Sequence, residues 1–312
     1  MIQRNDDILV TGANGFLGQH LLQELRNNGY YNVIPIDKGC DLRKKKEAKI
    51  GIHKEDSVVI HLAGNVGGIG YNLANPGKLF YDNIMIGLNT IEVARKKCVS
   101  LKKFILIGTI CAYPCFTRVP FKENDLWEGY PEPTNAPYGV AKRALITMVQ
   151  AYRKQYGFPG ISLLPVNMYG PGDSLDPKRN HVIPALIIKF LQAVKNNEEK
   201  VVLWGSGNPT REFLYVKDAA TAIRLAMENY DSPEPVNIGT GKEISILELA
   251  AMIACKCNYW GEIVWDTTMP DGQHRRCLDV SKAASEFWFT AETELEDGID
   301  ETIVDIKDRL SI

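Results

Sequence analysis

A glycine-rich segment, Gly12-Ala-Asn-Gly15-Phe-Leu-Gly18, constrains the fold of this chain more than any other feature of its sequence. It directly follows a short apolar run at 7–11 and opens a helix-like stretch at 19–27. Three glycines alone often mark nothing more than a turn. Between a strand and a helix, however, they allow a tight turn and a close approach of the backbone to a pyrophosphate, whose charge suits a helix N-terminus. The segment therefore predicts dinucleotide binding.

Short apolar runs alternate with amphipathic stretches along the first half of the chain. Strands that are apolar on both faces, separated by helices, are typical of a parallel sheet covered on both sides. We therefore predict an α/β fold with a doubly wound parallel sheet of the Rossmann type. The expected strands are 7–11, 32–37, 57–62, 103–108 and 160–167, and the expected helices are 19–27, 84–97 and 141–156.

The length of 312 residues predicts either one large domain or two closely associated ones. We expect the apolar runs near 213–216 and 235–238 to return to the main sheet, which makes the smaller domain discontinuous. The predicted dinucleotide-binding domain covers 1–168 and 213–239. The predicted substrate domain covers 169–212 and 240–312.

Composition excludes several classes of function. A net charge of −2 gives no basic surplus for nucleic acid or an acidic membrane surface. We find no apolar stretch near the roughly 20 residues that span a bilayer and no signal peptide before the first strand. The seven cysteines are odd in number and scattered, which fits a reducing cytoplasm. Cys255-Lys-Cys257 lacks a second ligand pair at zinc-finger spacing, so we expect no metal.

Asp37, 19 residues beyond Gly18, ends the second expected strand. A carboxylate at this position can accept hydrogen bonds from the adenosine ribose and would repel a 2′-phosphate, which favours NAD(H). Alternatively, Asp37 forms a turn, and Lys38 and Arg43 can screen a phosphate. The cofactor therefore stays open between NAD(H) and NADP(H). Asp41-Leu42 is expected at the wall of the adenine pocket.

Tyr138 and Lys142 are four residues apart and share one face of a helix. Most such pairs lie on a solvated surface. Near a dinucleotide site, however, a neighbouring ammonium favours the phenolate, so we expect it to lower the pKa of the phenol from about 10. Such a phenol can shuttle a proton near neutral pH. Thr109 and Cys111, two apart on an expected strand, point to the same side.

These residues resemble an extended short-chain dehydrogenase/reductase. Almost the whole chain resembles the GDP-L-fucose synthase family, whose members are 3,5-epimerases and 4-reductases of GDP-4-keto-6-deoxy-D-mannose. The matching pieces are Val66-Gly-Gly-Ile-Gly70, Cys111-Ala-Tyr-Pro114, Glu132-Pro-Thr-Asn135, Asn167-Met-Tyr-Gly-Pro171, His181-Val-Ile-Pro-Ala-Leu186, Trp204-Gly-Ser-Gly207, Arg211-Glu-Phe-Leu214 and Pro270-Asp-Gly-Gln273.

The resemblance implies catalytic roles for five residues. Cys111 is the base and His181 the acid that invert C3 and C5. A thiol usually has a pKa of about 8.5 and an imidazole one of about 6.5, and both values suit proton exchange with an enolate. Tyr138 protonates the C4 oxygen while the nicotinamide delivers hydride. Lys142 tunes the phenol and holds the ribose, and Thr109 hydrogen-bonds the same oxygen. Without the resemblance, packing is the more common role for a cysteine such as Cys111, and the sequence fits a helix cap at His181 as well as a catalytic role.

The resemblance also implies two sets of binding residues. The cofactor-binding set is Gly12, Asn14, Gly15, Phe16, Leu17, Gly18, Asp37, Asp41, Leu42, Leu62, Ala63, Gly64, Tyr138 and Lys142. The substrate domain becomes the sugar-nucleotide side, because guanidinium groups suit a diphosphate. The substrate-binding set is Asn167, Val182, Lys189, Trp204, Arg211 and Arg276.

Some positions depart from the common family pattern. Thr109 stands where Ser is usual and keeps the hydroxyl. Asn14 and Asp37 stand against the NADPH preference of the family, and Lys189 and Arg276 keep the charge but change the geometry of the donors.

Two alternative functions remain. One is a 4-epimerase or a simple 4-ketoreductase of another nucleotide sugar, in which Cys111 and His181 take no part. The other is a non-catalytic dinucleotide-sensing protein. The resemblance further implies a GDP-sugar substrate and a homodimer formed through the helices at 84–97 and 141–156.

Overall fold

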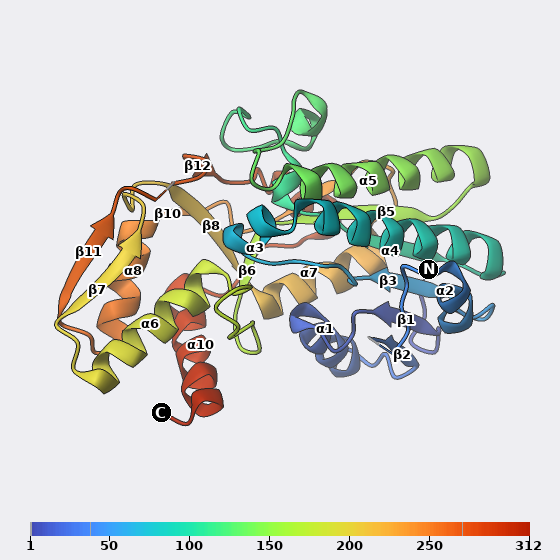
Figure 1. Ribbon diagram of the computed structural model, residues 1–312. Helices are drawn as coiled ribbons and strands as arrows, with labels where there is room; N and C mark the ends of the chain where they lie inside the picture. The colour runs from blue at the N-terminus through green and yellow to red at the C-terminus, as the bar shows by residue number, and fades with distance from the viewer. Residues whose placement is uncertain (1, 38, 270) are drawn as a thin grey trace.

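The computed structural model describes residues 2–37, 39–269 and 271–312, so Lys38 and Pro270 lie outside the described residues. Its main sheet has six parallel strands in the order β2-β1-β3-β4-β5-β9, which confirms the predicted doubly wound α/β fold (Figure 1). The order reverses between β1 and β3, and open sheets of this kind bind ligands at that point, at the carboxyl ends of the strands. The strands are β1 (Ile8–Thr11), β2 (Val33–Ile36), β3 (Val58–His61), β4 (Lys103–Ile107), β5 (Gly160–Pro165) and β9 (Val236–Ile238).

Helices cover both faces of this sheet (Figure 1). Three helices begin earlier than predicted: at Phe16, Pro76 and Ala136. Proline in the first turn suits a helix start, because its missing N–H would have no partner there; this applies to Pro76 and Pro137. The helices of this part are α1 (Phe16–Asn27), α2 (Lys45–Gly51), α3 (Ile69–Ala74), α4 (Pro76–Lys97), α5 (Ala136–Tyr156), α7 (Val216–Asn229) and α9 (Ser281–Phe287), with the 3-10 turns η1 (Ile110–Ala112) and η2 (Glu123–Trp127).

A smaller region adjoins the carboxyl ends of the main strands and holds its own hydrophobic cluster. In it β8 pairs with β6, β10 and β12, and β7 pairs with β11. Three helices pack together on these strands (Figure 1). The elements are β6 (Asn167–Tyr169), α6 (Val182–Asn196), β7 (Lys200–Trp204), β8 (Thr210–Tyr215), β10 (Glu243–Ser245), α8 (Ile246–Lys256), β11 (Glu262–Asp266), β12 (Arg275–Arg276) and α10 (Leu295–Leu310).

The predicted return of 213–216 to the main sheet is wrong, whereas β9 joins it beside β5 as expected. The reason lies in the alternation of side chains along β8. Leu214 is buried in the core of the main sheet, while Phe213 and Tyr215 are buried in the second cluster. A strand that is apolar on both faces fits either sheet, so its sequence alone cannot show which one it joins.

The two hydrophobic clusters support a division into two domains, and the boundaries themselves stay a prediction. Apolar side chains between 278 and 289, which the sequence placed in the second domain, pack in the cluster of the main sheet. Phe121 N–H donates to the carbonyl of Cys277, which ties this returning segment to the main domain. Part of the predicted substrate domain therefore packs against the main sheet.

Candidate active site

The glycine segment forms the turn between β1 and α1. Gly12 has φ +70°, and a side chain there would place its Cβ 2.9 Å from Ala63 N and Cα, at the end of β3. A Cβ on Gly18 would lie 2.4 Å from the carbonyl oxygen of Gly12. Only glycine therefore fits where the turn packs on its own helix and on the neighbouring strand. Phe16 and Leu17 begin α1, so this helix N-terminus faces the reversal point of the sheet.

The residues that follow β3 lie beside this turn. Ala63 N–H donates to Thr11 Oγ1 at 3.3 Å, and a Cβ on Gly64 would lie 2.8 Å from Asn83 Oδ1 and 3.9 Å from Lys142 Nζ. Leu62, just before them, packs partly buried against the main core. The turn after β1, the turn after β3 and Lys142 thus form one continuous surface.

At the far end of this surface, Asp37, Asp41 and Arg43 have side-chain partners. Asn14 Nδ2 donates to Asp37 Oδ2 at 2.8 Å, across the predicted ribose position. Arg43 donates to both carboxylate oxygens of Asp41, from Nε at 2.8 Å and Nη2 at 3.0 Å, and to Asp82 Oδ1 at 3.1 Å. The hydrogen bonds from Arg43 lower the pKa of Asp41 to about 2. Leu42 is buried next to this pair.

Tyr138 and Lys142 lie buried in the first turns of α5, not on a solvated face. The predicted lowering of the phenol pKa is wrong. Burial raises the pKa of Tyr138, although a hydrogen bond with Thr109 opposes the rise. Lys142 donates to the carbonyl of Ile107 at 2.8 Å, and its Nζ lies 5.9 Å from the centre of the Tyr138 ring. Burial also lowers the pKa of Lys142 to about 8.

The expectation that Thr109 and Cys111 share a strand is also wrong, because β4 ends at Ile107. Thr109 instead caps the short turn η1, where its Oγ1 accepts from Cys111 N–H at 3.2 Å. A Cβ on Gly139 would lie 2.3 Å from the carbonyl oxygen of Cys111, so α5 presses directly on this turn. Thiol, hydroxyl and phenol are thus brought together by a capped turn against a helix.

Arg276 is aimed at the sulfur of Cys111. Its Nη1 donates to Cys111 Sγ at 3.6 Å, and its Nε donates to Gln273 Oε1 at 2.7 Å. Its Nη2 lies 3.8 Å from Glu132 Oε2, in an ion pair whose two side chains are both about one-tenth exposed. Burial and the charge of Arg276 lower the pKa of Arg211 to about 10, while the charges of Cys111 and Glu132 oppose this. Arg276 therefore links the thiol to the Glu132 carboxylate.

His181 precedes α6 and makes no side-chain cap there. Its Nδ1 lies 3.3 Å from Asp173 Oδ2. Arg179, two residues before His181, reaches the segment after β3: Gly68 N–H donates to the carbonyl of Arg179 at 3.3 Å, and Arg179 Nη2 donates to Asn65 Oδ1 at 3.0 Å. The segment 64–68 therefore runs from the Lys142 ammonium to the loop that carries His181.

The remaining predicted substrate residues extend outward from this centre. Asn167 Nδ2 donates to the carbonyl of Glu212 at 3.2 Å, directly beside Arg211. Lys189 donates to the carbonyl of Val202 at 2.6 Å, which places it near Trp204 at the end of β7. The Trp204 side chain is 65% exposed. Val182 begins α6 and packs partly buried.

Two residues of the site were not predicted. Asp173 gave no signal in the sequence, because an aspartate after a glycine–proline–glycine turn reads as a turn former. Glu132 lay in a quoted motif, but its spacing gave no reason to place it beside Arg276. Both contacts depend on how distant segments fold together.

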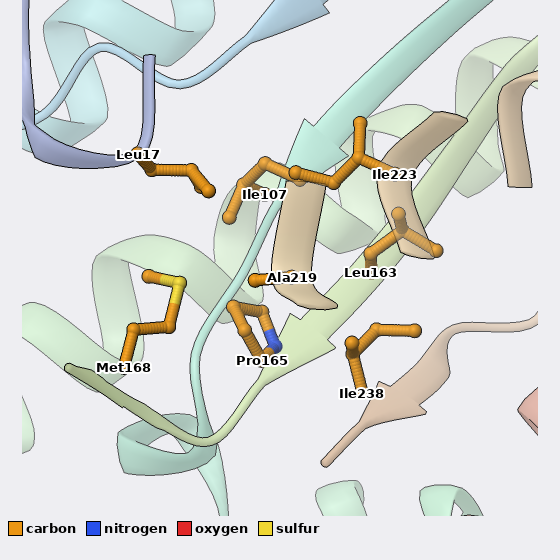
Figure 2. A pocket seen from close by; sticks show the side chains of 8 residues that line it. All are labelled: Leu17, Ile107, Leu163, Pro165, Met168, Ala219, Ile223 and Ile238. Carbon is orange, nitrogen blue, oxygen red and sulfur yellow. The ribbon is translucent and has the colours of Figure 1, made fainter. Parts of the chain in front are cut away.

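A small cavity lies beneath the cofactor surface and is not a binding site. Its volume of about 10 Å³ is near that of a single water, and its lining is almost wholly apolar. Figure 2 shows side chains from α1, α7 and the ends of β4, β5 and β9 converging on it. The lining residues are Leu17, Ile107, Leu163, Pro165, Met168, Ala219, Ile223 and Ile238.

Residues 8–239 match the model of the NAD dependent epimerase/dehydratase family. The chain belongs to this family. It is therefore an NAD(P)-dependent oxidoreductase/epimerase, as predicted from the glycine turn, the Tyr138–Lys142 pair and the family resemblance. Among the curated relatives, GDP-L-fucose synthase 1 of Arabidopsis thaliana is 38% identical over 304 residues, which is 97% of this chain and 93% of the relative.

Solved structures of sugar-nucleotide enzymes share the fold along nearly the whole chain. A GDP-6-OMe-4-keto-L-xylo-heptose reductase from C. jejuni superposes with a TM-score of 0.91 at 29% identity and covers 99% of each chain. A GDP-L-fucose synthetase from Naegleria fowleri, bound to NADP, gives a TM-score of 0.87 at 28% identity and covers 100% of this chain and 97% of its own. Within the described residues, none of the helices has the length and apolarity to cross a membrane.

Proposed function

We propose that this protein converts GDP-4-keto-6-deoxy-D-mannose to GDP-L-fucose by 3,5-epimerisation and NAD(P)H-dependent 4-keto reduction. The placement of Cys111 carries the proposal. A 4-ketoreductase needs a phenol, a hydroxyl and a cofactor surface, which Tyr138, Thr109 and the glycine turn supply. It has no use for a thiol that is held in the same turn as Thr109 and accepts a hydrogen bond from Arg276.

The epimerisation is possible because the C4 ketone makes the C–H hydrogens on C3 and C5 acidic. Cys111 removes the proton from C3 or C5, which gives an enolate, and His181 delivers a proton to the opposite face. Each inversion leaves a proton on the sulfur and removes one from the imidazole. Both groups then return to their starting states by exchange with solvent, so the new C–H hydrogens come from water.

The reduction uses the other side of the site. When bound, the nicotinamide cofactor supplies the hydride for C4. Tyr138 gives its proton to the C4 oxygen, and Thr109 donates a hydrogen bond to that oxygen. Lys142 holds the ribose. Burial keeps the phenol protonated before the reaction, which suits a proton donor. Arg211, Lys189 and Trp204 lie on the outer side, where we place the diphosphate and the base.

A second candidate is a 4-ketoreductase that does not epimerise, and the similarity to the C. jejuni heptose reductase favours it. Turnover of GDP-4-keto-6-deoxy-D-mannose in D₂O separates the two candidates. We expect oxidation of the reduced nicotinamide, with deuterium at both C3 and C5 of the product. Oxidation without label would favour the simple reductase. Neither oxidation nor label would contradict the proposed function.

We further propose that NADH is the preferred cofactor, although the Naegleria relative was solved with NADP. We place Asp37 at the ribose, and Arg43, a cation that could hold a 2′-phosphate, is engaged by Asp41 and Asp82. A 2′-phosphate there would be repelled by the Asp37 carboxylate.

Replacing Asp37 is expected to change this preference. In Asp37→Ala, kcat/KM with NADH should fall and kcat/KM with NADPH should rise. Because a hydrogen bond to a charged group contributes roughly 1.5–3 kcal/mol, we expect the ratio of the two values to change by roughly 10–100-fold. Steady-state kinetics with both cofactors measure the ratio, with Asp56→Ala, in the turn before the amino end of β3, as a control. A wild-type protein that prefers NADPH would contradict the assignment.

We also propose a cytoplasmic homodimer joined through α4 and α5. These helices pack against each other, and α4 leaves Phe80, Tyr81 and Leu88 at least 39% exposed on its outer side. A second copy of the helix pair would cover them. The cysteines Cys40, Cys98, Cys111, Cys115, Cys255, Cys257 and Cys277 are free thiols, which suits a reducing compartment.

A further inference from the structure

The loop between β6 and α6 holds a buried carboxylate against the imidazole of His181. Asp173 is 3% exposed, and its Oδ1 and Oδ2 lie 3.4 and 3.3 Å from His181 Nδ1. The His181 side chain, in contrast, is 39% exposed. Over the described part of the chain, Nε2 of this ring makes no hydrogen bond to protein. The ring is thus held on one side and open on the other.

Asp173 sits in a turn that distant elements fix in place. From α1, His20 Nε2 lies 2.8 Å from the carbonyl oxygen of Pro171. From α10, Arg309 Nη1 donates to the carbonyl of Asp173 at 2.8 Å, and Asp305 accepts from Gly172 N–H at 3.0 Å. The turn is therefore attached to both the cofactor-side helix and the last helix, and its carboxylate has little freedom to leave His181.

The other charged groups around His181 are engaged elsewhere. On its own loop, Arg179 reaches to Asn65 and stacks on Tyr71, and Asp176 accepts from the Lys178 N–H. The packed elements contribute Arg309 and Asp305, which bond to each other and to the turn. Burial lowers the pKa of His181. The hydrogen bond and the charge of Asp173 together raise it by more than burial lowers it, so the pKa lies above its ordinary value.

We propose that Asp173 is the positioning residue of the His181 acid, and this inference rests on the epimerase function proposed above. The carboxylate accepts from Nδ1–H, which selects the Nδ1–H tautomer of the neutral ring and leaves Nε2 directed at the substrate, where it carries the transferable proton in the imidazolium. It also keeps the imidazole protonated to higher pH, so that the proton needed at C3 and C5 is in place at neutral pH.

Replacing the carboxylate by an amide tests this role. In Asp173→Asn, deuterium incorporation at C3 and C5 at neutral pH should fall about 10–100-fold, the range for loss of a group that orients a catalytic histidine or ligand. Without the carboxylate, the imidazolium loses its proton at lower pH. The rate of exchange should therefore start to fall at a lower pH in the variant than in the wild type. Reduction of the already epimerised ketone should stay near the wild-type rate, and Asp173→Glu should recover part of the exchange.

Further variants separate positioning from a general loss of structure. Asp176→Asn, on the same loop, should exchange at the wild-type rate. The double variant Asp173→Asn, His181→Gln should lose no more exchange than His181→Gln alone, because the two residues act as one unit. Additive losses, or an unchanged pH profile in Asp173→Asn, would overturn the assignment.

The tautomer of His181 can also be measured in the wild-type protein, so this test does not depend on the folding of any variant. NMR of nitrogen-labelled histidine should show neutral His181 protonated at Nδ1, with a titration midpoint above that of free histidine. Neutral His181 protonated at Nε2 alone would contradict the Asp173 role. If the wild type shows no exchange at C3 and C5, the epimerase function fails instead, and the tautomer still reports on the Asp173–His181 pair.

Discussion

Replacing Cys111 with serine is expected to abolish epimerisation while sparing reduction. A serine hydroxyl keeps the shape of the side chain, but it loses a proton far less readily than a thiol, so it cannot remove one from C3 or C5 at neutral pH. Loss of a positioned base lowers rates by about 10²–10⁴-fold, and we expect deuterium incorporation at both carbons to fall by this amount. The phenol, the threonine cap and the cofactor surface remain intact.

The measurement compares two substrates. With GDP-4-keto-6-deoxy-D-mannose in D₂O, mass spectrometry of the product should show little label in Cys111→Ser. With the already epimerised ketone, oxidation of the reduced nicotinamide should continue within a few-fold of the wild-type rate. Cys115→Ser, in the same loop and also half-buried, is the matched control and should keep both activities. Equal loss of the two activities in Cys111→Ser would contradict its role as base.

Replacing Tyr138 with phenylalanine should give the opposite result. The change removes the proton donor for the C4 oxygen, so hydride transfer should slow by about 10²–10⁴-fold. Proton exchange at C3 and C5 should persist, since it depends on Cys111 and His181. The ring stays buried, and loss of one hydrogen bond with Thr109 costs the fold only about 1 kcal/mol. The protein should therefore stay folded.

Tyr152→Phe is the control for this variant. Tyr152 lies on the same helix α5 and donates to Glu92 at 2.9 Å, away from the site, so its loss should leave hydride transfer unchanged. Stopped-flow oxidation of the nicotinamide and label at C3 and C5 are measured on the same samples. A Tyr138→Phe protein that still reduces the ketone at the wild-type rate would rule out the phenol as the donor. Together, Cys111→Ser and Tyr138→Phe test epimerisation and reduction separately.

Local sequence was sufficient for features whose cause is local. The glycine turn depends on a positive φ at Gly12 and a close approach at Gly18, both of which only glycine tolerates, so the pattern itself carries the information. The main strands were found because buried parallel strands are continuously apolar. The apolar spacing alone did not predict the helix starts at Pro76 and Ala136, where Pro76 and Pro137 stand in the first turn.

Features that depend on burial could not be predicted from spacing. Tyr138 and Lys142 are neighbours on a helix, which suggested a lowered phenol pKa. In the fold both are buried, and removal from water opposes charge on each of them. Likewise, β8 is apolar on both faces, and only packing decides that Phe213 and Leu214 enter different cores.

The sequence by itself determined the class of chemistry, because a glycine turn, a phenol beside an amine, a thiol and an imidazole limit what a site can do. Tertiary structure decided how those groups are held. Arg276 reaches Cys111 across 165 positions of the chain, and a turn fixed by the first and last helices brings Asp173 to His181. Such contacts have no local signature, because their stability comes from packing between elements that are far apart in sequence.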